Sequence, residues 1–512
     1  MDFLTAHASK HPDRLAVVVG DGEGDARLTY AELEDRSNRL AHALLARGVQ
    51  PLDRCTTVGY NAPEHSVIGA ALRKMVAVAL PMSYRLTADE MGYQLEHSES
   101  RVVFAGGELV DRVEVAAQRC PVLQLRVAWG RPSLPEGWLR LEELLEEGTP
   151  DPPAVEVGLT GPSMSYTAGT TGNPKGAYRA RGTDPGVIHS YARWFDLRPG
   201  DVHLVAGPLY HSAPAAFAAF TTIFGGTNVV LRRFDAESAL AAIERHRVQT
   251  TFMAPILLQR LVGLSPEVRA RYDLTSMRAA VVAAAPCPFE VKRKVMEMFG
   301  QVLYEFYGSS EVGCNAVMRP EDQLRKPGSC GRPVEGVEIR VLGDDGHELP
   351  AGETGELFIQ SSQVITEYWR NPDATSAARR GEHFSVGDVG YFDDEGFLYI
   401  VDRKRDMVIS GGVNICTTEV ENAIHAHPDI WDVVVIGIPD PEWGEAVHAI
   451  VQPRPGASLS GDELIPWLRD RLADYKRPRT VEVRAELPRD EAGKIRKREL
   501  REPYWQGHER RV

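Results

Sequence analysis

The chain has 512 residues, which is more than one hydrophobic core can organise, so two or more domains are expected. Hydrophobic residues make up 43% of it and charged residues 25%, as in an ordinary soluble globular protein. The formal net charge of -14 argues against nucleic acid or an anionic membrane as the main partner, because phosphate backbones are bound by clustered Lys and Arg. An anionic cofactor held in a local basic pocket remains compatible with this charge.

The cysteines and the first residues exclude other classes. The 6 Cys are scattered, with no C-x-x-C pair and no His at zinc spacing, so neither a disulfide framework nor a structural zinc site is expected. Residues 1–15 have no apolar run, and no apolar stretch reaches the roughly 20 residues of a membrane span. The sequence therefore predicts a cytoplasmic protein without a membrane span, and it leaves open whether the protein forms a homodimer.

The first predicted element is a helix whose capping box is formed by Thr29 and Glu32 and which ends at Gly48. Strand-like runs and helical patterns alternate beyond it, as far as about residue 330. Four of the strand-like runs are residues 101–105, 202–206, 227–231 and 278–282. This alternation is typical of mostly parallel sheets covered by helices, which is an α/β fold class.

The pattern changes after residue 330. Short strand-like runs at 337–341, 355–359 and 396–401 lie between Gly/Asp turns and predict a β-rich, barrel-like subdomain over about 331–401. The charged segment 402–406 marks a boundary. We therefore expect an N-terminal domain over 1–401 and a C-terminal α+β domain over 407–512. In the latter we expect a helix capped by Thr418 and Glu421, a buried strand at 433–438 and a helix at 463–472.

The most informative stretch is Ser-Tyr-Thr-Ala-Gly-Thr-Thr-Gly-Asn-Pro-Lys-Gly at residues 165–176. Its glycines let backbone N–H groups converge on an anion, and its threonine hydroxyls and Lys175 add donors and a cation. The spacing is not that of a Walker A loop, because Gly176 follows the lysine where Ser or Thr would stand. The alternative is a polar surface turn, but Lys, Pro and three Thr together favour a site for the outer phosphates of a nucleotide.

This stretch resembles the phosphate loop of the adenylate-forming superfamily, which includes acyl-CoA synthetases, luciferases and the adenylation domains of non-ribosomal peptide synthetases. The resemblance spans nearly the whole chain, with the motifs in the family's order. It implies ATP-dependent activation of a carboxylic acid with Mg²⁺, then transfer to CoA, on a large α/β domain followed by a small mobile lid domain. The loop residues that it assigns to ATP binding are Thr167, Ala168, Gly169, Thr170, Thr171 and Lys175.

Further motifs extend the nucleotide site by resemblance. The run Tyr-Glu-Phe-Tyr-Gly-Ser-Ser-Glu at 304–311 is similar to the family's Tyr-Gly-x-Thr-Glu motif, which implies that Tyr307 packs on adenine, that Ser310 bonds the α-phosphate, and that both Ser310 and Glu311 are catalytic. Glu311 would hold Mg²⁺, which prefers carboxylate and phosphate oxygens. Asp388 and Arg403 would reach the ribose, although a solvated charged turn is the alternative for 402–406. The remaining residues assigned to ATP are Ala283, Ala284, Ala285, Pro286, Glu305, Phe306 and Gly308.

The acid would bind beside Pro-Leu-Tyr-His-Ser at 208–212, which resembles the motif whose His or aromatic residue lines the acyl pocket. The alternative for this His is a packed core residue. The resemblance implies an acyl pocket formed by Tyr210, His211, Ala215, Ala283 and Ser309. These residues are small or apolar, and none is a charged partner for an amino-acid ammonium group, so we expect a hydrophobic, bulky acid.

The C-terminal domain would supply the mobile groups. Residues 487–495 resemble the family's Pro-x-x-x-x-Gly-Lys motif, which implies that Lys494 binds ATP and is catalytic, bridging the acid and the α-phosphate. By the same resemblance Arg405 would be the hinge pivot, where Lys or Asp is usual, and Ser410, Gly411 and Gly412 would line the thiol channel. The basic cluster of Lys476, Arg477 and Arg479 is compatible either with CoA phosphates or with a solvated face.

The chemistry of the reaction explains this set of groups. A carboxylate is already ionised at neutral pH, so it needs no general base, but it must approach an equally negative phosphate. Positive charge and positioning are therefore what the site must supply. Lys175, Lys494 and Mg²⁺ on Glu311 would provide that charge.

Three alternatives to an acyl-CoA ligase stay open. The departures from the family pattern at Arg405, Val413 and Thr417 leave open an enzyme that only adenylates and hands acyl-AMP to another enzyme or a carrier protein. A non-catalytic nucleotide-binding protein on this fold is disfavoured, because no key group is missing. A luciferase-like oxygenase cannot be ranked by fold analogy.

Overall fold

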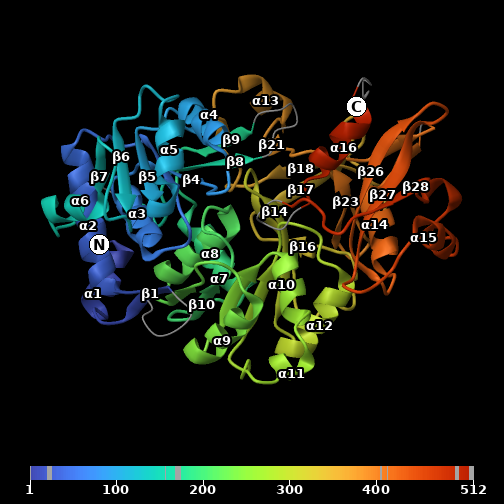
Figure 1. The fold of residues 1–512 in the computed structure, drawn as a ribbon, viewed down its shortest axis with the longest axis horizontal. Coiled ribbons are helices and arrows are strands. Elements are labelled where there is room, and N and C mark those ends of the chain that lie inside the picture. Colours follow the sequence, from blue (N-terminus) through green and yellow to red (C-terminus); the bar gives the residue numbers. More distant parts are fainter. Residues whose placement is uncertain are drawn as a thin grey trace.

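The computed structural model describes residues 2–19, 26–155, 157–167, 174–403, 406–411, 413–489 and 495–506. Within these residues the strands form four sheets, of eight, nine, six and five strands. Figure 1 shows the two largest sheets with their helices in the blue, cyan and green parts of the chain, and the C-terminal sheet at the far right in orange. The fold class predicted from the sequence is confirmed.

The eight-stranded sheet has the order β19-β9-β8-β4-β3-β5-β6-β7. It is parallel from β8 to β7, whereas β9 runs antiparallel to both β8 and β19. The strands are β3 (Arg54–Val58), β4 (Val78–Met82), β5 (Val102–Gly106), β6 (Leu125–Trp129), β7 (Trp138–Arg140), β8 (Ser163–Thr167), β9 (Lys175–Arg179) and β19 (Glu367–Tyr368). The segment between β8 and β9 is the stretch predicted to bind phosphate.

The nine-stranded sheet has the order β16-β15-β14-β13-β12-β10-β11-β1-β2, with antiparallel pairs at its two edges. Its strands are β1 (Leu15–Val19), β2 (Ala26–Thr29), β10 (Val202–Val205), β11 (Thr227–Val230), β12 (Thr250–Met253), β13 (Ala279–Val282), β14 (Leu303–Ser309), β15 (Gly313–Met318) and β16 (Arg332–Pro333). Side chains alternate between two cores: Phe252 packs under α8, and Met253 packs with α9, α10 and α12. The sheet is thus buried on both faces, which explains its apolar strands.

The helices of the large domain follow the predicted alternation. Helix α2 begins after Thr29, whose side chain forms the predicted capping box with Glu32. The helices are α1 (Phe3–Lys10), α2 (Tyr30–Ala46), α3 (Pro63–Lys74), α4 (Ala88–Ser98), α5 (Val110–Ala117), α6 (Leu141–Glu147), α7 (Pro185–Trp194), α8 (Ser212–Ile223), α9 (Ala236–His246), α10 (Pro255–Val262), α11 (Pro266–Arg269), α12 (Phe289–Phe299) and α13 (Pro372–Ala377). No helix in the described ranges is long and apolar enough to cross a membrane.

The six-stranded sheet is antiparallel throughout and corresponds to the predicted β-rich region. Its strands are β17 (Glu338–Leu342), β18 (Gly355–Gln360), β20 (Arg379–Arg380), β21 (His383–Phe384), β22 (Asp388–Phe392) and β23 (Leu398–Arg403). Strands β22 and β23 pair Asp388 with Arg403 directly, so this sheet brings the two predicted ribose residues together.

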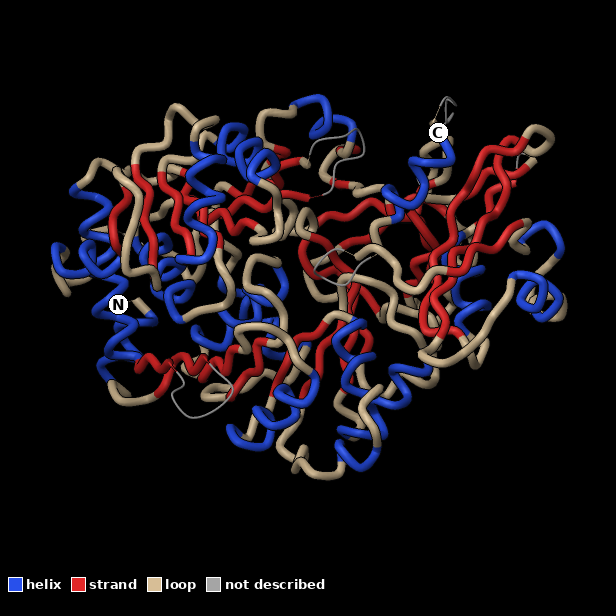
Figure 2. Tube along the Cα trace, in the orientation of Figure 1, coloured by secondary structure: helices blue, strands red, loops and turns tan. Residues whose placement is uncertain are grey.

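The C-terminal part has its own sheet and core, and it is the strand-rich region at the right of Figure 2. Its strands are β24 (Val408–Ser410), β25 (Val413–Ile415), β26 (Ile430–Asp440), β27 (Gly444–Pro453) and β28 (Thr480–Val483), and its helices are α14 (Thr417–His425), α15 (Gly461–Trp467) and α16 (Lys497–Trp505). Strand β26 contains the strand predicted at 433–438.

Two helix predictions in this part were wrong in detail. Helix α14 begins at Thr417 after Cys416, which makes no side-chain cap, so Thr418 and Glu421 do not cap it. The Glu421 carboxylate instead accepts a hydrogen bond from the Val435 backbone N–H, at 2.8 Å. The helix predicted at 463–472 is α15, which starts two residues earlier because Ser460 forms its capping box, and ends at Trp467.

Candidate active site

The centre of the candidate site is the buried carboxylate of Glu311, on the turn between β14 and β15. Its Oε1 accepts hydrogen bonds from the Thr167 hydroxyl, at 2.8 Å, and from the Tyr368 hydroxyl, at 3.4 Å. Lys175, at the start of β9, places its Nζ 5.0 Å from the centroid of the Tyr368 ring. The structure therefore brings three of the predicted residues, Thr167, Lys175 and Glu311, to one tyrosine that the sequence did not single out.

A second unpredicted residue, Arg179 of β9, supports the neighbouring turn. Its guanidinium donates to the Ser310 carbonyl at 2.7 Å and to the Gln363 carbonyl. Burial lowers the pKa of Arg179, and the Tyr191 and Glu311 groups oppose that shift. The only feature of the sequence that could have pointed to Arg179 was the presence of an arginine in a strand that is otherwise buried.

Ser310 lies where three segments meet. Its hydroxyl is 3.0 Å from that of Ser212, the first residue of α8, and the Ser212 hydroxyl donates in turn to Ser165 of β8, at 3.5 Å. The position of Gly308, just before this turn, has no room for a side chain, because a Cβ there would lie 2.0 Å from the Gly313 carbonyl oxygen. Ser309 also belongs to the turn, and its hydroxyl accepts a hydrogen bond from the Glu311 N–H, at 3.2 Å.

The predicted ribose residues form a cluster with Tyr307, in which Tyr307 and Asp388 are buried and Arg403 is half-buried. The Tyr307 hydroxyl donates to Asp388 Oδ2 at 2.8 Å, and Arg403 Nε donates to Asp388 Oδ1 at 3.1 Å. Burial and the adjacent Asp388 carboxylate raise the pKa of Tyr307 well above its usual value, so the phenol keeps its proton and remains a donor. The ring of Tyr307 is thus fixed in orientation by its hydroxyl.

Strand alternation separates Glu305 and Phe306, which the sequence placed together at the nucleotide. The Glu305 carboxylate is buried and paired with the ammonium group of Lys292, on α12. The Phe306 ring lies on the opposite face of β14, 5.7 Å from the Phe195 ring and 6.1 Å from the Phe252 ring. The Glu305 carboxylate thus lies on the same face of β14 as Tyr307, whereas the Phe306 ring packs in the aromatic core of the other face.

The predicted acyl region begins at the N-terminus of α8. His211 is the N-cap residue of α8, and its ring lies 4.3 Å from that of Tyr210. The Tyr210 hydroxyl and the His211 Nε2 are buried without a hydrogen-bond partner among the described residues. Burial lowers the pKa of His211 to about 4, so its ring is neutral at pH 7. Ala215 lies one turn further on, and Ala283 is buried at the end of β13.

Comparison with known proteins matches two family models to this chain. One is the AMP-binding enzyme model over residues 4–369, and the other is the AMP-binding enzyme C-terminal domain over residues 419–494. The chain belongs to the AMP-binding enzyme family. Within the adenylate-forming superfamily it falls in the acyl-CoA synthetase branch, as the sequence predicted.

Individual relatives cover almost the whole enzyme. It is 35% identical to a feruloyl-CoA synthase of Amycolatopsis over 485 residues, which are 94% of this chain and 95% of the relative. It is 33% identical to an indoleacetate–CoA ligase of Aromatoleum aromaticum over 508 residues, 98% of this chain and 97% of the relative. Among solved structures it resembles the amide bond synthetase McbA of Marinactinospora thermotolerans, with a TM-score of 0.85 and 27% identity over 98% of this chain and 100% of that one.

Several predicted site residues of the enzyme lie outside the described residues. They are Ala168, Gly169, Thr170, Thr171, Arg405, Gly412 and Lys494. Ser410 is the last residue of β24, and Gly411 follows it directly. The Gly411 N–H donates to the Trp443 carbonyl, at 2.7 Å.

The basic cluster expected in the C-terminal part is largely occupied by carboxylates. Lys476 pairs with Glu419 at 2.7 Å, and Arg477 pairs with Asp474. This arrangement favours the solvated-face interpretation for those two side chains.

The segment from Ala283 to Pro286, which the resemblance assigns to ATP binding, contains a strained backbone. Ala284 has a φ of +77°, a left-handed conformation that is unfavourable for a residue with a Cβ. The resemblance places a glycine at this position in most of the family. Ala285 and Pro286, which complete the motif, do not have a positive φ.

We expect Ala284→Gly to raise the free energy of unfolding of the enzyme by about 1 kcal/mol, because it removes this strain. The matched control is Ala285→Gly, which only adds chain entropy to the unfolded state and should not stabilise. The measurement is the urea midpoint of the two variants against the wild type. A midpoint for Ala284→Gly at or below that of Ala285→Gly would show that the strain is not there.

Proposed function

We propose that this AMP-forming acid–CoA ligase activates a hydrophobic carboxylic acid as its acyl-AMP, releases pyrophosphate, and transfers the acyl group to the thiol of CoA. The observation that carries the proposal is the meeting of Thr167, Lys175 and Glu311 at Tyr368. It gathers hydroxyl donors, a cation and a buried carboxylate at the end of the predicted phosphate loop. Relatives named as feruloyl-CoA synthase and indoleacetate–CoA ligase support the CoA step.

Glu311 fits the role of a magnesium ligand. Both hydroxyl donors bind its Oε1, and its Oε2 has no hydrogen bond within the described part of the chain. Mg²⁺ typically takes one or two protein carboxylates and completes its shell with water and phosphate oxygens. When bound, it would neutralise charge on the phosphates of ATP.

The residues of the chain itself supply positioning and charge. We propose that the Lys175 ammonium attracts the outer phosphates and that the Asp388 carboxylate, held by Tyr307 and Arg403, accepts from the ribose hydroxyls. Ser310 would donate to the α-phosphate. Lys494 would neutralise the negative charges of the acid and the α-phosphate as the two groups approach each other.

The surroundings of the proposed acyl pocket favour a hydrophobic acid. Helix α8 packs its Phe217 on Phe252, with ring centroids 5.5 Å apart, so the core covered by this helix is aromatic. Beside His211, the Tyr210 ring lies in a separate aromatic group with Tyr84, whose ring is 5.4 Å away.

Two arginines lie beside that group, and one of them, Arg232, is also paired with the Glu108 carboxylate, at 2.7 Å. Arg232 and Arg233 place their guanidinium groups over Tyr60, which contacts Tyr84. Positive charge does not attract the ammonium group of an α-amino acid. The Tyr210 hydroxyl and the His211 Nε2 are available for a polar substituent on an otherwise apolar acid.

The second candidate is an enzyme that makes acyl-AMP and passes it to an acceptor other than CoA. Two observations favour it: Val413, beside the predicted thiol channel, is exposed, and two residues of the basic cluster are already paired. The likeness to a protein named as an amide bond synthetase supports this candidate. Product analysis by mass spectrometry with and without CoA separates the two. Acyl-AMP that accumulates in the presence of CoA would favour the second.

We expect Lys494→Ala to reduce ATP–pyrophosphate exchange by on the order of a hundredfold or more, because it removes a cation from the transition state of adenylation. Transfer to CoA from chemically prepared acyl-AMP should be much less affected. Lys10→Ala, at an exposed site on α1, serves as the control and should leave exchange unchanged. Exchange at the wild-type rate in Lys494→Ala would refute the assigned role.

We expect a screen of carboxylic acids by pyrophosphate release to give the highest kcat/KM for hydrophobic acids. The reason is the group of tyrosine rings next to His211 and the arginines beside it. Equal concentrations of aryl, branched, linear and α-amino acids should be compared. A clear preference for an α-amino acid would overturn the predicted acid class and leave the adenylation proposal intact.

A further inference from the structure

Helix α4 (Ala88–Ser98) carries two aromatic side chains that reach toward the predicted phosphate loop. Tyr93 and His97 are four residues apart, so they lie on one face of the helix, and their rings stack at 5.3 Å with an interplanar angle of 23°. The Tyr93 hydroxyl donates to the Pro174 carbonyl, at 3.2 Å. The His97 Nδ1 lies 2.9 Å from the Tyr166 hydroxyl.

These two contacts are made at opposite ends of the same loop. Tyr166 immediately precedes Thr167, and Pro174 immediately precedes Lys175. The Tyr166 hydroxyl also donates to the Gln94 carbonyl, at 3.3 Å, which uses its single proton. The His97 Nδ1 is therefore the donor to the Tyr166 oxygen. One face of one helix thus holds both ends of the loop.

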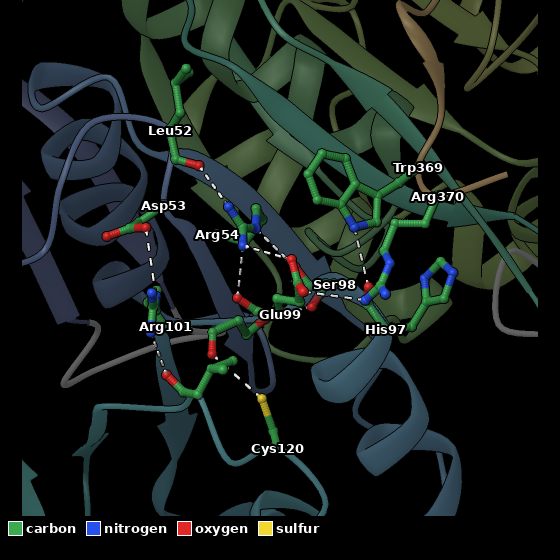
Figure 3. A network of polar contacts seen from close by, with 12 residues as sticks. Leu52, Asp53, Arg54, His97, Ser98, Glu99, Arg101, Cys120, Trp369 and Arg370 are labelled. Carbon is green, nitrogen blue, oxygen red and sulfur yellow. Dashed lines mark hydrogen bonds and ion pairs between the residues drawn. The ribbon is translucent and has the colours of Figure 1, made fainter. Parts of the chain in front are cut away.

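The C-terminal end of α4 is itself fixed to the strand that contacts Lys175 and Glu311. Figure 3 shows the Trp369 indole donating to the His97 carbonyl, at 3.2 Å, and Arg54 donating to the Ser98 and Glu99 carbonyls, at 2.8 and 3.1 Å. The Arg54 guanidinium also lies over the Trp369 ring, 5.2 Å from its centroid.

Trp369 also connects the end of α4 to the start of β9. Its backbone N–H donates to the Gly176 carbonyl at 2.7 Å, and its neighbour Arg370 pairs with Glu99 at 3.3 Å. Since Trp369 directly follows Tyr368, the helix end, the start of β9 and the tyrosine between Lys175 and Glu311 form one connected unit.

We propose that Tyr93 and His97 are positioning residues that hold the two ends of the phosphate loop and thereby set the affinity for the triphosphate of ATP. The inference rests on the proposed function, in which this loop binds the outer phosphates. A loop held in place before binding loses less conformational freedom when the phosphates arrive. AMP lacks the β- and γ-phosphates, so its binding should not depend on these contacts.

The test is Tyr93→Phe, which removes one hydroxyl and keeps the ring stacked on His97. The dissociation constants of ATP and AMP are measured by calorimetry without the acid, together with the melting temperature. We expect ATP to bind roughly three- to tenfold more weakly, as for the loss of one hydrogen bond, with AMP affinity unchanged. The matched control is Tyr272→Phe, which removes a hydroxyl bonded to Glu237 at 3.0 Å on the outer surface and should change neither constant.

A second pair of variants distinguishes the loss of the hydrogen bond to Tyr166 from a general effect on folding. His97→Ala removes the donor to Tyr166, whereas His97→Asn places an amide N–H near the position of Nδ1. We expect His97→Ala to weaken ATP binding selectively and His97→Asn to restore most of the affinity. If Asn and Ala behave alike, the hydrogen bond to Tyr166 is not what positions the loop.

The outcomes separate the inference from the function on which it rests. Wild-type protein without ATP–pyrophosphate exchange for any acid would contradict the proposed function. Wild-type exchange with an unchanged ratio of ATP to AMP affinity in Tyr93→Phe would overturn the inference alone. An equal loss of affinity for both nucleotides would also overturn it, because that is the signature of a general structural role.

Discussion

The geometry of the site depends on one buried carboxylate, that of Glu311. Burying a charge costs several kcal/mol unless hydrogen bonds replace its water. Here the hydroxyl groups of Thr167 and Tyr368 supply that replacement. Because Thr167 and Tyr368 belong to the eight-stranded sheet and Glu311 to the nine-stranded one, the same interaction joins the two sheets at the candidate site.

Within the part of the chain that the structure describes, few polar contacts attach the smaller C-terminal part. The buried Asp402, at the end of β23, accepts from the Thr417 N–H at 2.6 Å and from its hydroxyl at 2.8 Å. The Gln259 amide on α10 donates to the Trp431 carbonyl at 3.0 Å. An attachment that narrow is compatible with the proposed use of this part as a lid that brings Lys494 to the site and later withdraws it.

The sequence predicted the local features well. Because its motifs resemble those of the adenylate-forming superfamily, Lys175 was expected near Glu311 and Asp388 near Arg403. The capping box of Thr29 and four strands of the two large sheets, β5, β10, β11 and β13, were predicted from local pattern alone.

What the sequence could not give were pairings made across long separations. Tyr368, Arg179 and Trp369 contribute through partners that are distant in the sequence, on a turn or a helix, and no local pattern singles them out. The start of α14 was misplaced for the same reason: Asp402, from a different sheet, binds the Thr417 N–H and satisfies the helix end that Thr418 was expected to cap.

The most direct test of this account is the ATP–pyrophosphate exchange rate of Glu311→Gln. The amide keeps the shape and can still accept from Thr167 and Tyr368, but it removes the charge that would hold Mg²⁺. The account predicts a loss on the order of a hundredfold, with AMP binding unchanged, while Glu335→Gln at an exposed ion pair with Arg193 has no effect. Exchange in Glu311→Gln close to the wild-type rate would contradict it.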